Sequence, residues 1–388
     1  MRVCHVSPHL PPDQAANALL PAQLGEWFAA RGDAVAFVAH EPAQTDVAPA
    51  PLPGPVTWLP RRVVASRLGR TLRIDTLLRT RRILAALDRT AAGADLLHLH
   101  SNGLIVEVAA AWARRRGIPT ILTLYGTEIW HYRRRTIDPW TRAYRQAGEV
   151  TFYSQGLLDR ARDLGLDRPG LSVVYPPVSA TFVTPDEATR EAWRRDLGLR
   201  EPRVVLNVKR LHELAGQRYL VEAFARATAG RDDTRLVICG TGPLRASLEA
   251  QARDLGLAAR VTFAGLVPND VVARYAAVAD VFVLPSLLEA LPTVAVEALA
   301  AGTPVLSADH PGGVELHGIF GEDVAVVPRE DAVRLAAALA ERIDAPRRVS
   351  GETRRRLDAR FRRAAVEAAY ADAYARVRAA GPSAGRDR

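Results

Sequence analysis

The chain has 388 residues, 48% of them hydrophobic and 24% charged, which excludes an intrinsically disordered protein and indicates two or three globular domains. Its cysteines, Cys4 and Cys239, are too few for a disulfide framework and stand in no metal-ligand spacing. The sequence has no basic leader before an apolar run and no apolar stretch of about eighteen residues, so we expect a cytoplasmic protein.

The formal net charge is +9, and 51 of the 52 basic residues are arginine. Lys209 is the exception. With alanine and glycine also abundant, this bias is typical of a gene under strong GC pressure. Two interpretations of Lys209 follow: an ammonium group is required there instead of a guanidinium fork, or one lysine codon survived by chance.

The first half predicts alternating strands and helices of a parallel sheet. Residues 49–60 hold five prolines and are expected to form a loop. Residues 61–82 carry eight arginines and one acid, Asp75. They predict a basic amphipathic helix, either simply exposed or docked on an anionic membrane or nucleic acid, although stacking aromatics are missing. Strands are expected at 3–7, 35–39, 95–100, 120–124, 150–153 and 172–175, with helices at 19–30 and 104–116.

After an irregular segment at 176–185, the second half repeats the alternation. Strands are expected at 204–208, 236–239, 261–264, 281–284 and 305–307, with helices at 219–229, 243–255, 270–278 and 361–378 and a frayed tail at 381–388. We therefore predict an α/β protein of two doubly wound, Rossmann-like domains facing across a cleft. The expected division is an N-terminal domain at 1–178, a linker at 179–186, a C-terminal domain at 187–350, and a helix with a tail at 351–388.

The strongest functional signal is the segment PSLLEALPTVAVEALAAGTPVLSADHPGGVE at 285–315. Glu289 and Glu297 stand on either side of a predicted strand-to-helix turn. The free backbone N–H groups of a helix N-terminus suit a phosphate or a sugar hydroxyl. A carboxylate on each side accepts hydrogen bonds from vicinal hydroxyls.

This segment, with the pattern P-S-x-x-E-x(7)-E-A-x-A-x-G-x-P-V, resembles the retaining nucleotide-sugar glycosyltransferases of family 4, which have the GT-B fold. The resemblance implies that Glu289 holds the C3/C4 side of the donor sugar and that Glu297 binds the ribose. It also implies a loop whose amides approach the sugar and the diphosphate, formed by Ala290, Leu291, Pro292 and Thr293.

The same resemblance assigns the diphosphate site to the first strand end of the second half. Arg210 matches the family's diphosphate arginine, whereas the expected lysine position is Ala215, and Lys209 stands where a glycine is usual. Lys209 either supplies the lost charge or, as the neighbour of Arg210 on a strand, points to the opposite face. Gly240 matches the next strand-end turn and Val267 the segment that reads the base.

Acceptor residues are expected in the first half. The loop at 7–17 lacks the family's usual glycines, which makes Asp13, Gln14 and Asn17 candidates. Tyr125 replaces a histidine that contacts the C6 hydroxyl of the donor in the family, and Glu128 follows it. His98 and His100 resemble a metal pair, but alternate residues of a buried strand belong more often to the core. The resemblance implies no cofactor and no metal.

No aspartate–histidine or paired-carboxylate constellation is evident, so Arg210 and backbone dipoles are expected to assist departure of the diphosphate. The acceptor hydroxyl then attacks the same face and passes its proton to the leaving phosphate. Stretches such as TLYGTEIWHY and NVKRLHELAGQRYL look most like the actinomycete aminoglycoside-antibiotic enzymes of the α-D-kanosaminyltransferase type.

That implies transfer from UDP-kanosamine to a 2-deoxystreptamine pseudodisaccharide such as paromamine or neamine. A UDP-xylose enzyme of the gentamicin type, and a membrane-surface enzyme with a lipid acceptor, remain alternatives. A nucleic-acid binder, suggested by charge alone, leaves the glutamates unexplained, and the oligomeric state is not predicted. A cationic acceptor requires carboxylates, for which the candidates are Asp13, Glu107, Glu128 and Asp138.

Overall fold

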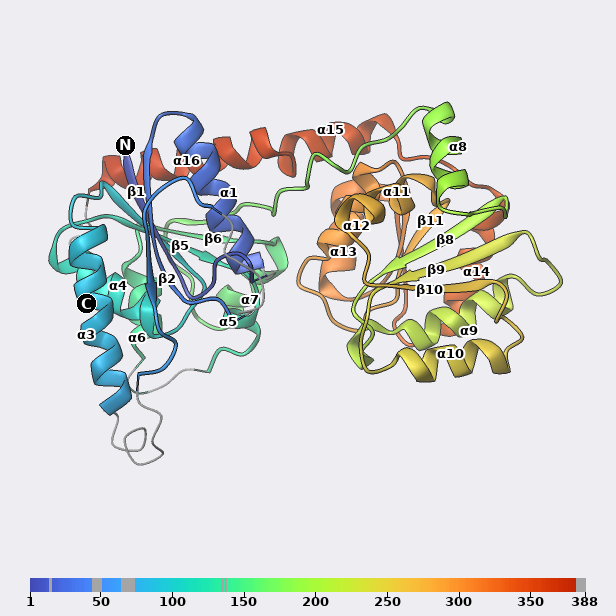
Figure 1. The fold of residues 1–388 in the computed structure, drawn as a ribbon, viewed down its shortest axis with the longest axis horizontal. Helices are drawn as coiled ribbons and strands as arrows, with labels where there is room; N and C mark the ends of the chain where they lie inside the picture. The colour runs from blue at the N-terminus through green and yellow to red at the C-terminus, as the bar shows by residue number, and fades with distance from the viewer. Residues whose placement is uncertain (14–15, 44–50, 64–73, 134–135, 137, 382–388) are drawn as a thin grey trace. The chain divides into compact units, whose positions relative to one another are not determined.

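The computed structural model describes residues 1–388 except 14–15, 44–50, 64–73, 134–135, 137 and 382–388. The chain divides into two compact units (Figure 1). One comprises Met1–Tyr175 and Val366–Arg388, and the other comprises Pro176–Ala365.

The first unit is built on a seven-stranded parallel sheet with the order β3-β2-β1-β4-β5-β6-β7. The chain runs outward from β1 to β3 and then crosses to β4, so the topological switch point lies between β1 and β4. The elements are β1 (Arg2–Ser7), α1 (Ala16–Ala30), β2 (Ala34–His40), β3 (Val56–Leu59), α3 (Ile74–Thr90), β4 (Leu96–His100), α4 (Leu104–Arg115), β5 (Thr120–Leu124), α5 (Thr127–Trp130), α6 (Pro139–Gln146), β6 (Glu149–Phe152), α7 (Gln155–Asp163) and β7 (Leu171–Val173).

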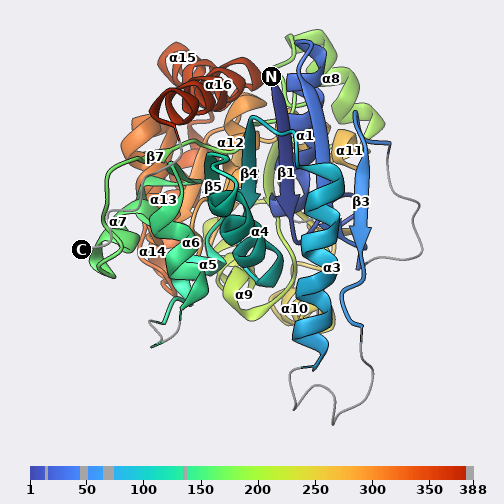
Figure 2. The same cartoon turned by 90° about the vertical axis from the view of Figure 1, so that its left-hand side faces the viewer.

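Helices cover both faces of this sheet (Figure 2). Helices α3, α4 and α6 pack side by side on one face, and α1 lies on the other. Because both faces are covered, β4 and β5 are buried along their whole length, which explains their short, mostly apolar sequences. The expected loop at 49–60 is wrong in part: Val56–Leu59 pair with Phe37–His40 as edge strand β3. An edge strand tolerates the surrounding prolines, because one side of its backbone needs no partner.

The C-terminal helix α16 (Arg363–Ala380) belongs to the first unit from Val366 onward, instead of forming a separate segment with the tail. Its Tyr370 and Tyr374 are fully buried. The Tyr374 ring lies 4.8 Å from that of Phe28 on α1, and its hydroxyl is 2.7 Å from His98 Nδ1. Burial of these two tyrosines anchors the end of the chain on the first sheet.

The second unit repeats the plan with a six-stranded parallel sheet, β10-β9-β8-β11-β12-β13. Helices α9, α10 and α14 cover one face, and α8, α11, α12 and α13 lie on the other (Figure 1). The elements are α8 (Glu187–Asp196), β8 (Arg203–Val208), the 3-10 turn η1 (Glu213–Ala215), α9 (Gln217–Ala227), β9 (Thr234–Cys239), α10 (Arg245–Asp254), β10 (Val261–Gly265), α11 (Asn269–Val278), β11 (Val281–Leu284), α12 (Thr293–Ala300), β12 (Val305–Ala308), α13 (Pro311–Phe320), the 3-10 turn η2 (Gly321–Asp323), β13 (Val324–Val327), α14 (Ala332–Asp344) and α15 (Gly351–Arg360).

The switch point of the second sheet lies between β8 and β11. The backbone pairing of these strands ends at Leu206 and Phe282, and the buried Asn207 side chain then donates to the Val283 carbonyl at 2.8 Å. This amide bridge joins the strands just before their carboxyl ends separate. The loops that follow β8 and β11 are thereby held at fixed positions.

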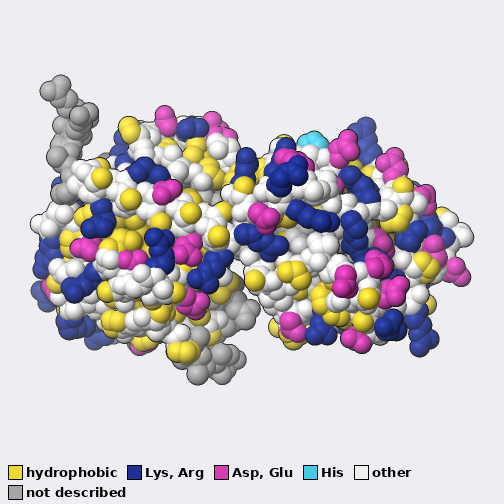
Figure 3. All heavy atoms as spheres, turned by 90° about the horizontal axis from the view of Figure 1, so that it is seen from above, with side chains coloured by type: hydrophobic (Ala, Val, Ile, Leu, Met, Phe, Trp, Pro, Cys, Tyr) yellow, Lys and Arg dark blue, Asp and Glu magenta, His cyan; other side chains and the backbone are white. Residues whose placement is uncertain are grey.

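On the face seen in Figure 3, basic side chains are scattered among acidic side chains instead of forming one basic patch. Several also hold the fold together: Arg348 donates to the Ala277 and Ala279 carbonyls, and Arg376 pairs with buried Glu149 at 2.8 Å. In the described part of the chain, no helix is both long and apolar enough to cross a membrane.

Candidate functional site

The loops after β8 and β9 approach each other so closely that only glycine fits between them. A Cβ atom on Gly240 would lie 2.1 Å from the Lys209 carbonyl oxygen, and one on Gly242 would lie 2.1 Å from that of Leu211. Gly240 also has a φ of 139°, in the region that favours glycine. These contacts fix the backbone at Lys209 and Arg210, the segment predicted to face the diphosphate.

Lys209 turns toward Glu289. It lies just beyond the last residue of β8, and its ammonium forms an ion pair with the Glu289 carboxylate. The two side chains are 22% and 17% exposed, so the pair is largely shielded from water. The adjacent Arg210 is exposed. Ala215, the expected lysine position, is fully buried.

The loop between β11 and α12 is held by the start of α13. Gly312 donates its N–H to the Glu289 carbonyl at 3.1 Å, and a Cβ on Gly312 would lie 2.8 Å from the Ala290 carbonyl oxygen. Leu291 and Thr293 are partly exposed, and Pro292 precedes α12 without a side-chain cap. The first N–H groups of α12 are therefore available to a ligand.

His310 caps the start of α13, the helix that holds this loop. Its Nδ1 accepts the Gly313 N–H at 2.9 Å, and its other ring nitrogen is 3.2 Å from Ser307 Oγ. Burial, together with the positive charges of Lys209 and Arg329, lowers the pKa of His310 to about 4. The imidazole is thus a neutral structural support of the loop.

Glu297 lies on the second turn of α12. Burial raises the pKa of its carboxyl to about 7, and no described residue forms a hydrogen bond or ion pair with it. A carboxyl group with a raised pKa, in a helix that begins at this loop, suits a ligand with hydroxyls. Val267, predicted to face the base, follows β10 and is partly exposed.

In the first unit, three of the four carboxylates expected for a cationic acceptor line one cavity of about 290 Å³. Glu128 is 5% exposed and accepts the Gly126 N–H at 2.9 Å, and Asp138 accepts the Thr141 N–H at 3.0 Å at the start of α6. Glu107 is partly buried on the first turn of α4. The cavity also contacts Asn102, Gly103, Thr127, His131, Tyr132, Arg133, Pro139 and Trp140.

The fourth candidate, Asp13, lies elsewhere and is paired within the protein. It is 6% exposed and accepts from Arg61 at 2.9 Å and from the Ala43 N–H at 2.8 Å. Its Oδ2 is 2.7 Å from His9 Nδ1. This aspartate–histidine pair was not predicted, although the spacing of four residues between His9 and Asp13 after a strand is a signal for it. Asn17 Oδ1 has no hydrogen-bond partner among the described residues, and Gln14 lies outside them.

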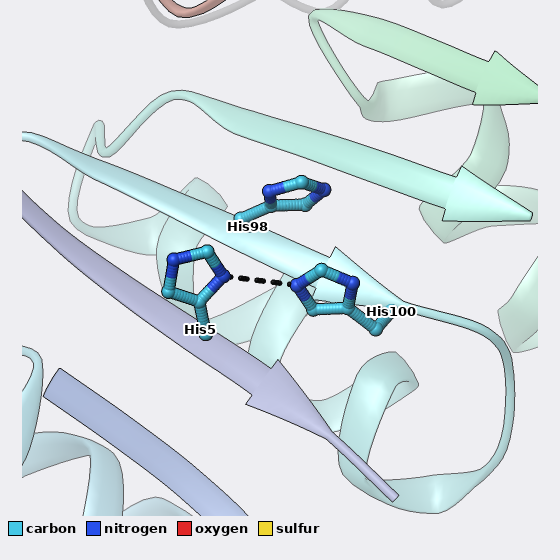
Figure 4. A group of neighbouring side chains, drawn as sticks. All are labelled: His5, His98 and His100. Atoms are coloured by element: carbon cyan, nitrogen blue, oxygen red, sulfur yellow. Dashed lines mark hydrogen bonds between the residues drawn. The ribbon is translucent and has the colours of Figure 1, made fainter. Parts of the chain in front are cut away.

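His98 and His100 belong to a buried group of three histidines with His5, shown in Figure 4. His5 Nδ1 and His100 Nε2 are 3.0 Å apart, and the rings of His98 and His100 stack at 4.0 Å. Both ring nitrogens of His98 form hydrogen bonds with hydroxyl groups, Nδ1 with that of Tyr374 and Nε2 with that of Thr123, each at 2.7 Å. In this arrangement both nitrogens of His98 are engaged by hydroxyls, whereas the buried His5 Nε2 has no hydrogen-bond partner among the described residues.

The histidine core continues to Tyr125. The Tyr125 hydroxyl is 2.7 Å from His100 Nδ1, and burial raises the pKa of this phenol well above its usual value. The ring remains partly exposed after β5, and it packs edge-on against Tyr153 at 4.6 Å. The hydroxyl of Tyr125 is thus directed into the histidine core.

Comparison with known proteins agrees with this arrangement. Residues 22–182 match the model for "Glycosyltransferase Family 4", and residues 189–364 match the model for "Glycosyl transferases group 1". A 2-deoxystreptamine glucosyltransferase of Streptomyces kanamyceticus is 31% identical over 67% of this chain and 71% of its own length. The chain belongs to the family 4, group 1 glycosyltransferases.

Two further proteins are similar to this chain, one in sequence and one in structure. The teichuronic acid biosynthesis glycosyltransferase TuaC of Bacillus subtilis, itself described as putative, is 30% identical over 75% of this chain and 68% of its own. Anabaena HepE, solved in complex with UDP, superposes with a TM-score of 0.77 and 18% identity over 97% of this chain and 100% of its own. The glycosyltransferase therefore has the two Rossmann-like domains of the GT-B fold.

The residues predicted from the sequence fall into separate groups within the two units. Three residues predicted to act on the donor, Lys209, Glu289 and Glu297, follow strand ends of the second sheet or lie in the adjoining helix. Glu128 joins Glu107 and Asp138 in the cavity of the first unit, and Asp13 does not.

Proposed function

We propose that this glycosyltransferase moves a sugar from a UDP-sugar to a polycationic acceptor of the 2-deoxystreptamine pseudodisaccharide type, such as paromamine or neamine. The cavity lined by Glu107, Glu128 and Asp138 carries the proposal. The cavity is lined by these three carboxylates, of which Glu128 and Asp138 already accept hydrogen bonds within the protein, and by one guanidinium, that of Arg133. In a chain of net charge +9, this excess of carboxylates makes it a locally acidic site that attracts ammonium groups. The similarity to a 2-deoxystreptamine glucosyltransferase supports the same acceptor class.

On the donor side, we assign the ribose to Glu297, the sugar to Glu289, and the diphosphate to Arg210 and the amides of residues 290–293. The ion pair between Lys209 and Glu289 favours a donor without charge near C3. Kanosamine carries an amine at C3, and its ammonium form would compete with Lys209 for the same carboxylate. A neutral sugar of the glucose or xylose type is therefore the first candidate, and kanosamine the second.

We further propose that transfer proceeds with retention of the anomeric configuration and without a metal ion. Arg210, exposed at the strand end, and the helix N-terminus would stabilise the charge that develops on the departing diphosphate. The anomeric proton of the product, observed by NMR, tests this step: an α-linked product from an α-linked donor is expected.

A lipid acceptor at a membrane surface is the alternative, favoured by the start of α3. Ile74 and Leu77 are 43% and 54% exposed there, and exposed Arg81 and Arg82 follow. Mass spectrometry of products from paromamine, neamine and a panel of UDP-sugars tests the first proposal. Failure of all of them, combined with salt-sensitive binding to vesicles of anionic lipid, would support the alternative.

A further inference from the structure

We propose that Tyr132 is a specificity-determining residue of the acceptor cavity, whose aromatic ring packs against a ring of the bound acceptor. The inference rests on the proposed function, and it concerns recognition of the body of the acceptor in addition to its charge. Among the described residues that line the cavity, His131, Tyr132 and Trp140 carry aromatic rings. His131 is exposed, Tyr132 is partly exposed, and Trp140 is only 7% exposed. Tyr132 is the one of the three that combines access for a ligand with support from other rings.

The hydroxyl of Tyr132 is held at the start of α6. It lies 2.8 Å from Thr141 Oγ1 and 3.5 Å from Asp138 Oδ2. Asp138 in turn accepts from the Thr141 N–H at 3.0 Å and from the Thr141 hydroxyl at 2.6 Å, which fixes the first turn of the helix. A ring that is held before the ligand arrives loses little conformational freedom on binding.

Two further rings support Tyr132 from the protein interior. The Trp140 ring lies 5.4 Å from that of Tyr132, at an interplanar angle of 46°, and 5.6 Å from that of Tyr144, at 35°. Separations of about 4.5–7 Å between ring centroids are those of favourable aromatic pairs. Tyr144 is fully buried and donates its hydroxyl to the Leu166 carbonyl at 2.9 Å. The aromatic contacts thus run from the buried Tyr144 to the partly exposed Tyr132.

The combination of an aromatic ring with carboxylates defines the chemistry of the ligand. A saturated six-membered ring in the chair form carries polar groups around its edge and C–H groups on its faces. Such a face buries apolar surface against an aromatic ring, and ammonium groups at the edge are attracted by Glu107 and Asp138 and by the π-electrons of Tyr132.

An aminocyclitol or an amino sugar meets both requirements of this cavity. A neutral hexose meets only the first, because it has no ammonium group for the carboxylates. A lipid headgroup that carries a phosphate brings a negative charge, which the excess of carboxylates in the cavity opposes. The ring and the carboxylates together therefore favour a cationic, saturated ring over both of these ligands.

The test measures the affinity of the wild type, Tyr132→Leu and Tyr132→Phe for paromamine by isothermal titration in the presence of UDP. We expect the dissociation constant to rise about tenfold in Tyr132→Leu, which lacks the ring, and to stay within about twofold in Tyr132→Phe, which keeps it. All of these proteins should bind UDP with equal affinity. Trp58→Leu, at a partly exposed ring of β3 that does not line the cavity, is the matched control and should bind paromamine like the wild type.

Saturation-transfer NMR of the wild type adds a measurement that does not depend on the folding of a variant. Irradiation of aromatic protons of the protein should transfer magnetisation most strongly to the C–H protons of one ring of bound paromamine. Equal transfer to all paromamine protons, or wild-type affinity in Tyr132→Leu, would overturn the proposal.

An equal loss of affinity in Tyr132→Phe and Tyr132→Leu would overturn it as well, because the hydroxyl would then merely hold the loop. If the wild type itself neither binds paromamine nor converts it to a glycoside, the proposed function is refuted, and the role of Tyr132 with it. The two failures are distinguishable, since one appears in the wild type and the other only in the variants.

Discussion

Lys209 and Glu289 form an ion pair that joins the segments following β8 and β11, the two strands at the switch point of the second sheet. The pair can form because β8 ends at Val208, so Lys209 is free of the alternation that sends adjacent strand residues to opposite faces. Lys209 therefore does not simply take the place of the lysine expected at position 215 beside the diphosphate. The charge of Lys209 is directed at Glu289, the carboxylate assigned to the donor sugar.

Lys209→Met should change the selection among donors. With the ammonium removed, Glu289 can pair with a cationic sugar, so we expect the affinity for a UDP-3-amino sugar to rise about tenfold relative to that for UDP-glucose. Lys209→Arg should keep the wild-type preference. Isothermal titration with both donors measures the ratio, and UDP alone serves as the reference ligand. An unchanged ratio in Lys209→Met would refute a role in donor selection.

Glu297 should make UDP binding depend on pH. Because burial raises the pKa of its carboxyl to about 7, the ionised form that best accepts ribose hydroxyl bonds gains population above that pH. We expect UDP affinity to rise about tenfold from pH 6 to pH 8 in the wild type. In Glu297→Gln the rise should shrink to the part contributed by the phosphates of UDP. Equal slopes in the two proteins would contradict the assignment.

The raised pKa of Glu297 also has a consequence for stability without ligand. A carboxyl whose pKa is higher in the folded state than in the unfolded chain favours folding below the unfolded value, and this contribution is lost as the pH rises through about 7. Glu297→Gln should therefore flatten the decrease in free energy of unfolding between pH 5 and pH 8. Urea unfolding at these two pH values provides the measurement. A wild-type stability that increases over this range more than that of the variant would oppose the prediction.

Glu107→Gln should weaken acceptor binding. Removing one of the carboxylates of the cavity lowers its attraction for ammonium groups, so we expect the KM for paromamine to rise about tenfold with kcat nearly unchanged. Glu26→Gln, an exposed substitution on α1 of the same unit, is the matched control. Raising the salt concentration should reduce the difference between wild type and Glu107→Gln. Equal KM values at low salt would exclude the cavity as the acceptor site.

Prolonged dialysis against a chelator should leave both turnover and the thermal midpoint unchanged. The physical reason is the core formed by His5, His98 and His100, in which His98 has both nitrogens bonded to hydroxyls and stacks on His100. Elemental analysis of the purified protein should find zinc well below one equivalent. A fall in thermal midpoint that zinc restores would instead identify this core as a metal site.

By itself the sequence determined the class of fold and the donor motif. Short apolar strands that alternate with helices predict a parallel sheet covered on both faces. Glu289 and Glu297 lie in a single strand–loop–helix segment, so their spacing could be read directly from the sequence. Such features depend on neighbours in the chain. The prolines at 49–60 predicted a loop and not the strand β3. An edge strand is stabilised by hydrogen bonds to its neighbour, here β2, and this pairing cannot be seen in the local sequence.

Contacts between residues far apart in the chain were decided only by the tertiary structure. In the folded chain the single lysine, Lys209, pairs with Glu289. Glu107, Glu128 and Asp138 line one cavity, and the buried Asp13 contacts the ring of His9. Folding also placed arginines among acidic side chains and backbone carbonyls. The excess of positive charge therefore identifies no partner, because the meaning of a charge depends on the groups that folding places beside it.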